Sequence, residues 1–202
     1  MSISIPQFKA AMARVSTQAM ILTAGCKTKN DILHGMTLSS VCSLSVHPKP
    51  LLQFNLHLPS YTSQALHENH GQLCLHLMPP TSRSVFLSRT FAAGIKTDRK
   101  HFDVKPEDGE IFHEMTTPFA HIGKSNYSLH DTGRGLVPVL NEAEKAFVCK
   151  KHEVFKVDSH EIWVVDVTDI LSPNKHYEAK QSGGLLYYQR GFHKVGSSLQ
   201  ER

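Results

Sequence analysis

The chain has 202 residues, of which 40% are hydrophobic and 20% are charged. Such a chain is long enough to bury a sizeable core and too apolar for wholesale disorder. Its net charge of +4 suits an anionic ligand but is too small to indicate binding to DNA or RNA. We therefore expect a single domain over residues 1–202, without a nucleic-acid partner.

The cysteines and the N-terminus bear on the cellular compartment. The four cysteines stand far apart and form no CxxC pair, which argues against a zinc ribbon or a dense disulfide scaffold and favours a reducing compartment. No apolar run reaches the roughly 18 residues of a membrane-spanning helix, so no membrane association is expected. We expect a cytoplasmic protein. A mitochondrial matrix protein is the alternative if the source is eukaryotic, because Lys9 and Arg14 precede the first acidic residue, Asp31, as in a transit peptide.

The first half of the chain alternates strand patterns with helical ones. Pro6 opens a short amphipathic helix with apolar residues at helical spacing on one side, namely Phe8, Ala11, Met12 and Val15. A later helix begins after Ser60 as N-cap and ends before Gly71. A third helix is predicted over 82–92. Strands are predicted at 19–25, within 27–37, at 51–58 and at 72–78.

The second half of the chain predicts mostly strands. Residues 94–130 are rich in glycine and proline and predict loops. Strand patterns resume at 145–157, 160–170 and 184–190. Many strands with few short helices favour a mainly β fold, an antiparallel β-barrel with helical additions, since closing a sheet removes its edges. The regular strand and helix alternation of a doubly wound fold is missing.

The stretch "HGMTLSSVCSLSVHPKP", residues 34–50, is rich in short hydroxyl side chains. Hydroxyls and backbone N–H groups suit a phosphate, above all at a helix N-terminus where the helix dipole is favourable. Two such places occur, the run from Thr37 to Ser45 and the helix start at residues 60–63, and strand 51–58 leads from one to the other. The pattern indicates either a polar crevice for a phosphorylated ligand or a solvated strand face beside an ordinary N-cap.

Residues 34–78 resemble the flavin reductase-like family, whose members read G-M-T-x-S-S-x-x-S-x-S-x-x-P-P, then an apolar strand, then S-x-T before a helix. Three later stretches agree with that family in the same order. They are "LVPVLNEAEKAFVCK" (136–150), "DSHEIWVVDV" (158–167) and "GGLLYYQRGF" (183–192). The resemblance covers most of the chain and implies an FMN-binding split barrel of the antiparallel Greek-key type.

The resemblance also implies roles for individual residues. Asn55 and Leu56 would touch the flavin from the next strand, and Ser60 and Thr62 would bind its phosphate at the helix start. His160 would lie on the side where a nicotinamide or partner substrate docks. The isoalloxazine ring and ribityl chain would be lined, largely through backbone groups, by Thr37, Leu38, Ser39, Ser40, Val41, Cys42 and Ser43.

The sequence departs from the family pattern at three places. Lys49 separates the two prolines, Tyr61 stands where the family often has arginine beside the phosphate, and Asp158-Ser159 replaces Gly-Asp before the histidine. The first two changes leave FMN binding plausible on chemical grounds. The third puts the use of a nicotinamide in question.

The resemblance implies an NAD(P)H-dependent flavin reductase that passes a hydride from NADH or NADPH to FMN, or to FAD. It further implies a homodimer, and a partner oxygenase is an expected consumer of the reduced flavin. Two alternatives stay open. One is an FMN-dependent oxidase or oxygenase acting on an organic substrate, and the other is a non-catalytic flavin or haem binding protein on the same barrel.

Other conspicuous residues predict structure more than chemistry. His67 and His70 stand three apart on a predicted helix and could hold a metal, but exposed histidines on a polar face are commoner, so no metal site is expected. Cys42 and Cys149 are expected to be small buried fillers rather than nucleophiles. Core or dimer-interface positions are predicted for Trp163, Phe155 and Ile162.

Overall fold

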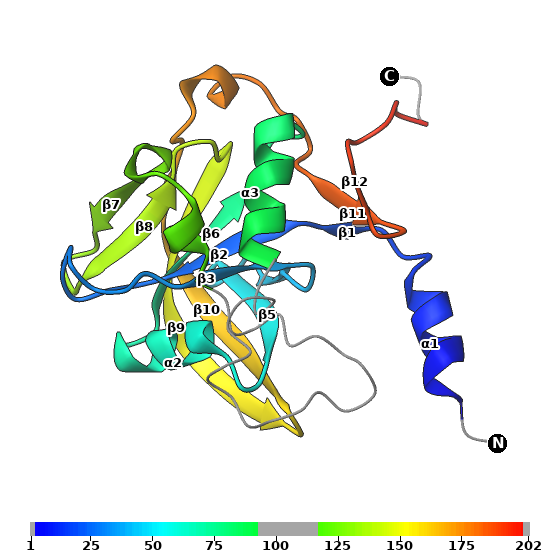
Figure 1. Cartoon of the computed structure of the whole chain (residues 1–202), viewed down its shortest axis with the longest axis horizontal. Coiled ribbons are helices and arrows are strands. Elements are labelled where there is room, and N and C mark those ends of the chain that lie inside the picture. Colours follow the sequence, from blue (N-terminus) through cyan, green and yellow to red (C-terminus); the bar gives the residue numbers. More distant parts are fainter. Residues whose placement is uncertain (1–2, 93–116, 200–202) are drawn as a thin grey trace.

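The fold is built on a seven-stranded antiparallel sheet (Figure 1). The computed structural model describes residues 3–92 and 117–199 of the chain. Neighbouring strands follow the order β3-β2-β6-β9-β10-β5-β4. Their bounds are Met20–Ala24 for β2, Gly35–Leu38 for β3, Cys42–Ser45 for β4, Leu51–His57 for β5, Gln72–Leu77 for β6, Lys145–Val157 for β9 and His160–Leu171 for β10. The prediction of a mainly β fold with few helices is confirmed.

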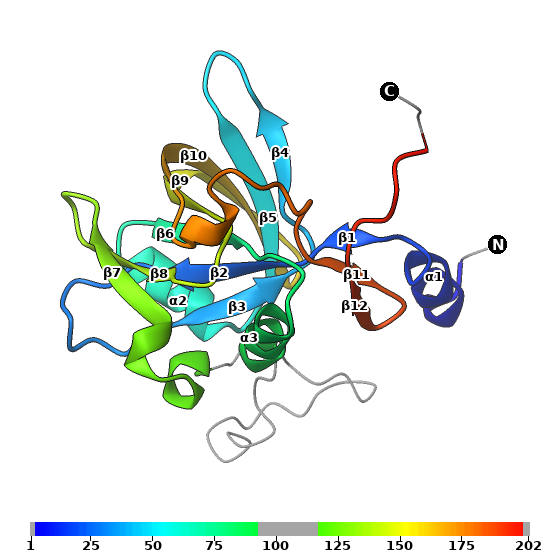
Figure 2. The same cartoon turned by 90° about the horizontal axis from the view of Figure 1, so that it is seen from above.

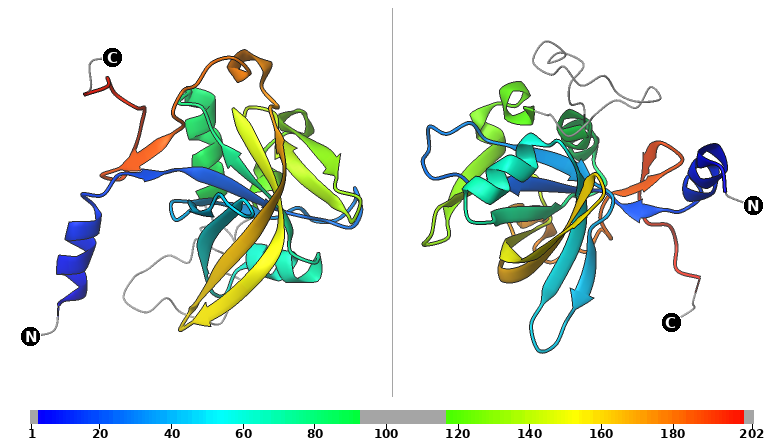
Figure 3. Two further views of the ribbon diagram at one scale, coloured as in Figure 1. Left: turned by 180° about the vertical axis from the view of Figure 1, so that it is seen from behind. Right: turned by 90° about the horizontal axis from the view of Figure 1, so that it is seen from below.

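The two edges of this sheet are consecutive in the chain. β3 and β4 are joined by residues 39–41, yet within the described part of the chain β3 pairs only with β2 and β4 only with β5. Among the described strands, hydrogen bonding therefore does not close the predicted barrel. Figure 2 shows the β4–β5 hairpin extending away from the rest of the sheet, so that β3 and β4 diverge. The long β9–β10 hairpin crosses the molecule beside them (Figure 3).

Two smaller sheets flank the main one. β1 (Thr17–Gln18) pairs with β11 (Leu186–Tyr188), which forms a hairpin with β12 (Gly191–His193). The strand predicted at 184–190 is thus shorter, because Gln189 and Arg190 have positive φ and turn the chain back. β7 (Tyr127–Asp131) and β8 (Leu136–Leu140) form the other hairpin.

The prediction of a loop over 94–130 is wrong at its C-terminal end, where the first strand of the β7–β8 hairpin begins. Short 3₁₀ turns occupy Pro118–His121 and Lys124–Asn126, and β7 then begins at Tyr127. Residues 94–116 of that predicted loop lie outside the described residues. β8 contains Pro138, which lacks the N–H of a regular strand residue and made the pattern hard to recognise.

All three predicted helices are present, with differing burial. α2 (Tyr61–Glu68) and α3 (Ser82–Ala92) each bury one side against the sheets. α1 (Ile5–Met12) starts with a capping box formed by Ser4 and Gln7 but buries none of its residues. Its apolar side is exposed, with Phe8 58% and Met12 49% accessible. Figure 1 shows α1 standing apart from the sheets, on the side of the molecule where the C-terminus lies.

The core lies on both faces of the main sheet. One cluster packs α2 against β5, β6 and β10, where the rings of Phe54 and Trp163 stack with centroids 6.2 Å apart. The other packs α3 onto β2 through Leu87 and Phe91. Trp163 is fully buried, as predicted, and Ile162 is half-buried. Phe155 is 52% exposed and lies outside the core, because β6 pairs with β9 only up to Lys150 and leaves the end of β9 without a neighbour on that side.

His76 is a fully buried polar residue that joins three strands. Its ring Nδ1 lies 2.9 Å from the Ile21 carbonyl oxygen of β2. The Leu140 backbone N–H of β8 donates to Nε2 over 3.1 Å. Nε2 accepts, so the neutral ring must carry its proton on Nδ1 and donate to Ile21. Burial lowers the pKa of His76 from its ordinary value of 6.5 to about 4.

The four cysteines are free thiols. Cys149 is buried as predicted, and burial raises its pKa. Cys42 is exposed, so the expectation of a buried filler is wrong there: it lies on the edge strand β4, where the Gln53 amide donates to its sulfur over 3.0 Å. Among the described helices, none has the length and apolar character needed to cross a membrane.

Candidate functional site

One pocket lies beside the gap between β3 and β4. It has a volume of about 400 Å³ and is bordered by the β3–β4 connection and by the ends of β5 and β10. Helix α3 and the β11–β12 hairpin close its far side. Its lining residues are Ala19, Met36, Thr37, Leu38, Ser39, Ser40, Asn55, His57, Phe91, Ala92, His160, Tyr187 and Phe192. Apolar and aromatic groups beside a few polar ones suit a planar ligand.

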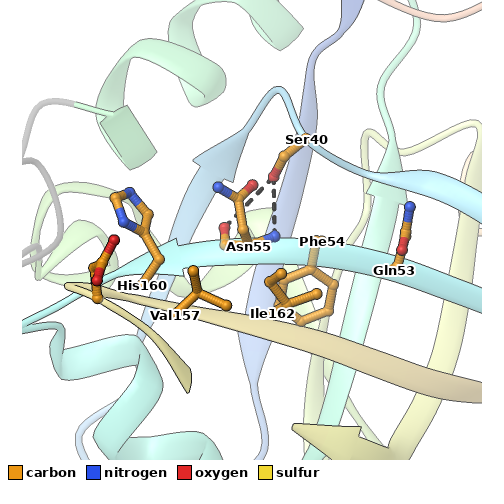
Figure 4. Close-up of a pocket in the computed structure, with 8 residues that line it drawn as sticks. Ser40, Gln53, Phe54, Asn55, Val157, His160 and Ile162 are labelled. Carbon is orange, nitrogen blue, oxygen red and sulfur yellow. Dashed lines mark hydrogen bonds between the residues drawn. The ribbon is translucent and has the colours of Figure 1, made fainter. Parts of the chain in front are cut away.

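A second pocket of about 440 Å³ adjoins the first. The two share Ser40, Asn55 and His160, so they form one hollow on either side of these residues. Figure 4 shows this part, with Val157 and Ile162 from the β9–β10 hairpin beside His160. The hollow therefore combines an apolar wall with hydrogen-bonding groups.

Strand alternation explains which side chains reach the hollow. β5 and β10 are antiparallel neighbours, in which His160 pairs with His57 and Ile162 with Asn55. These four residues line the hollow. The intervening residue of β5, Leu56, points into the core and is 1% exposed. The period of two along a strand thus separates the site face from the core face.

Hydrogen bonds fix the β3–β4 connection to its surroundings. The Ser40 hydroxyl accepts from the Asn55 backbone N–H over 3.2 Å and lies 3.4 Å from the Asn55 carbonyl oxygen (Figure 4). The Thr37 hydroxyl donates to the Ser88 carbonyl of α3 over 2.7 Å. Both hydroxyls are thereby used within the protein, and a ligand at this edge would meet backbone groups of residues 39–41.

Six of the predicted site residues line the hollow, namely Thr37, Leu38, Ser39, Ser40, Asn55 and His160. The other residues predicted to line the ring are elsewhere. Val41 is partly buried against the core, and Leu56, predicted to touch the flavin from the next strand, has its side chain within the core. Cys42 and Ser43 are exposed on β4 and do not line either pocket.

Ser60 and Thr62 mark the start of α2, as predicted. The Ser60 hydroxyl accepts from the Ser63 backbone N–H over 3.2 Å and so caps the helix. Both side chains are buried and line neither of the two pockets. The Thr62 hydroxyl has no hydrogen-bond partner among the described residues. Helix N-termini are places where phosphate oxygens bind, but this hydroxyl is fully buried in the structure.

His160 borders both pockets. The Ser159 hydroxyl lies 3.3 Å from its Nδ1, and the ring of His57 meets it edge-on with centroids 4.8 Å apart. Ser159 thus contacts His160 directly. It stands where the family that the sequence resembles has aspartate. Asp158 also lines the second pocket and has a positive φ at the β9–β10 turn.

The lining residues that sequence reasoning missed include three with aromatic rings, His57, Tyr187 and Phe192. His57 stands two residues after Asn55 on a predicted strand, so strand periodicity could have placed it on the same face. Tyr187 and Phe192 belong to the stretch 183–192 that resembles the family, but nothing in the sequence brings this hairpin to the pocket. Their rings pack edge-on with centroids 5.4 Å apart.

His67 lies on α2 and His70 lies just beyond its end. His67 lies 3.0 Å from a Glu161 carboxylate oxygen and against the Trp163 ring. His70 has a positive φ beyond the helix end. Within residues 3–92 and 117–199, no group of three histidine, cysteine, aspartate or glutamate side chains is arranged to hold a metal ion.

Comparisons with known proteins give the family. The profile described as "Flavin reductase like domain" matches residues 12–196. The 4-hydroxyphenylacetate 3-monooxygenase reductase component of Pseudomonas aeruginosa is 23% identical over 190 residues, covering 93% of this chain and 90% of that protein.

Solved structures agree in fold. The styrene monooxygenase flavin reductase of Pseudomonas putida S12 matches with a TM-score of 0.61 and 21% identity, covering 95% of this chain and 99% of that one. The flavin reductase HpaC, solved with NADP⁺, matches with a TM-score of 0.65 and 19% identity, covering 95% and 98%. The chain therefore belongs to the flavin reductase-like family.

Proposed function

We propose that the chain is an NAD(P)H-dependent flavin reductase that binds FMN in the hollow between β3, β5 and β10 as one domain over residues 1–202. The observation that carries this proposal is the hollow itself, which combines the β3–β4 connection, Asn55 and His160 next to aromatic side chains. Family membership supports the same activity. In this proposal the open side between β3 and β4 is the opening of an FMN-binding split barrel.

The residues present fit a phosphorylated flavin. The backbone groups of residues 39–41 and the side chain of Asn55 would hold the ring edge. The start of α2, where Ser60 and Thr62 lie, would hold the phosphate through backbone N–H groups. FMN is the flavin proposed, with FAD as the alternative.

The protein's contribution to the reaction would be positioning. A bound flavin supplies the redox chemistry, accepting a hydride from NADH or NADPH and passing the electrons on. His160 and His57 would shape the side where the nicotinamide docks. The apolar surfaces of Val157 and Ile162 would keep water from that face. In this account His160 orients a substrate and no side chain serves as an essential acid.

The test is flavin titration of the purified protein combined with nicotinamide oxidation assays. We expect uptake of FMN and oxidation of NADH or NADPH that saturates with added FMN. Failure to bind FMN, with no nicotinamide oxidation in its presence, would overturn the proposal. A tightly bound flavin that is inert to both nicotinamides would favour an oxidase or a non-catalytic binding protein instead.

Ser40→Ala is expected to raise the KM for FMN about tenfold, since the β3–β4 connection would lose its hydrogen bonds to Asn55. The nicotinamide KM should change far less, because the lost hydrogen bonds join the β3–β4 connection to Asn55 and not to His160. Steady-state kinetics with each substrate varied in turn would measure both values. Ser128→Ala on the distant strand β7 is the matched control. An unchanged KM for FMN would contradict the role given to this connection.

The partners proposed are a second copy of the chain and an oxygenase that consumes reduced flavin. The named relatives include reductase components of monooxygenases, which favours the oxygenase. α1 favours the homodimer, because an eight-residue helix that buries nothing is unstable alone and its apolar side needs a cover.

Phe8→Glu is expected to shift the protein from dimer to monomer, weakening the dimer at least about tenfold, because the carboxylate would be buried on the apolar side of α1. Light scattering after size-exclusion chromatography gives the mass. Arg14→Gln changes charge just beyond the same helix and should leave the dimer intact. A dimeric Phe8→Glu protein would show that α1 lies outside the interface.

A further inference from the structure

The Glu161 carboxylate of strand β10 takes part in three hydrogen bonds, two of them with residues of helix α2. The Ser63 hydroxyl donates to Oε2 over 2.6 Å, and the Trp163 indole N–H donates to the same oxygen over 3.0 Å. His67 Nε2 lies 3.0 Å from Oε1. Ser63 and His67 are one turn apart on α2, so the carboxylate contacts one face of the helix at two positions.

The carboxylate is well screened from water and held in its charged form. The Glu161 side chain is only 12% exposed. Burial by itself would raise the pKa of Glu161, but the hydrogen bonds from Ser63, His67 and Trp163 bring it below its usual range. A charged group in such a setting needs all its partners, since losing one leaves it poorly satisfied.

The position of Glu161 connects two parts of the proposed flavin site. It follows His160, which borders both pockets, and points to the opposite face of β10. Its partner Ser63 is the residue whose backbone N–H the Ser60 hydroxyl caps. One side chain thus links the strand that carries His160 to the first turn of α2, where Ser60 and Thr62 lie.

We propose that Glu161 is a positioning residue that fixes the first turn of α2 against β10 and thereby sets the preference for a flavin with a terminal phosphate. The inference rests on the proposed function, since it concerns the phosphate end of that same site. Glu161 touches no ligand in this arrangement. It acts through Ser63, whose place in the helix determines where the N–H groups and the Thr62 hydroxyl point.

The sign of the effect separates this role from simple electrostatics. A negative charge near a phosphate repels it, so removing the charge alone would strengthen FMN binding. Removing the hydrogen-bond acceptor loosens the first turn and would weaken FMN binding. Glu161→Gln removes the charge and also removes one acceptor. The amide keeps one acceptor oxygen, but its NH₂ group is a donor at the position where a carboxylate oxygen of Glu161 accepted.

The experiment compares the affinities for FMN and for riboflavin, which lacks the phosphate, in the wild-type protein and in Glu161→Gln. We expect the variant to bind FMN about tenfold more weakly and riboflavin within about twofold of wild type. Ser63→Ala should change the two affinities in the same way. Glu68→Gln makes the same charge change on the exposed side of α2 and should change neither. Thermal denaturation of each variant accompanies the titrations.

Three outcomes would overturn the inference. In the first, Glu161→Gln loses FMN and riboflavin affinity equally, as a general loss of stability would produce. In the second, the variant keeps the preference of the wild-type protein or binds FMN more tightly. If Glu161→Gln does not fold, Ser63→Ala alone decides between these results. In the third, the wild-type protein binds flavin without preferring FMN, which also removes the proposed phosphate site. Absence of any flavin binding contradicts the proposed function itself.

Discussion

Replacing His76 with alanine is expected to lower the free energy of unfolding by about 3–5 kcal/mol. The imidazole is fully buried and bridges β2 and β8 through the Ile21 carbonyl and the Leu140 N–H. Alanine would leave both backbone groups without a partner and create a cavity between the two sheets. The position is fully buried, so water does not readily replace the two lost hydrogen bonds.

Urea denaturation followed by circular dichroism would measure this loss. His121→Ala removes an exposed imidazole and is the matched control, expected to change stability by less than about 0.5 kcal/mol. His76→Gln should fall between the two, because an amide can both donate and accept but does not reproduce the ring geometry. A cost for His76→Ala no larger than that of the control would contradict the structural role given to this residue.

His76 also predicts an acid-dependent loss of stability. Its pKa is about 4 in the folded protein and 6.5 ordinarily, so below pH 6.5 the unfolded chain binds a proton that the folded protein does not. The contribution of the neutral ring is therefore complete above pH 6.5 and is lost progressively as the pH falls to about 4. The difference in pKa corresponds to about 3 kcal/mol.

The measurement is the free energy of unfolding at several pH values between 7 and 4 for wild type and His76→Gln. Carboxylates contribute to acid sensitivity in both proteins, so the difference between the two curves isolates the histidine. This difference should narrow towards pH 4, where the wild-type protein has lost most of its advantage. Parallel curves would mean that His76 is charged or solvated in the folded state.

Sequence patterns within single strands predicted most of the main sheet. The elements that were missed depend on contacts between segments that are distant in the chain. Strands β2, β5, β6, β9 and β10 carry clear alternating or apolar runs. β8 does not, because Pro138 interrupts it, and its pairing with β7 is a tertiary feature. The apolar side of α1 was visible in the sequence. Whether another surface covers that side depends on assembly, which periodicity cannot reveal.

The site was predictable where it follows one strand and not where separate segments meet. The motif around Thr37 and the spacing to Asn55 identified one wall of the hollow. Leu56 was assigned to the ligand although alternation points its side chain to the core. Tyr187 and Phe192 reach the pocket only because the β11–β12 hairpin pairs with β1, a contact more than 160 residues apart in the chain. Such a pairing leaves no local signal.

The alternation along β10 constrains how the β9–β10 turn can change in length. His160 and Ile162 face the hollow while Glu161 and Trp163 face α2 and the core, with only Asp158 and Ser159 between the two strands. Inserting or deleting one residue here with the two-residue turn retained would shift β10 by one residue against β9 and exchange these faces, burying an imidazole and exposing an indole. Natural variation in this turn should therefore occur in steps of two residues, or be absorbed by a bulge.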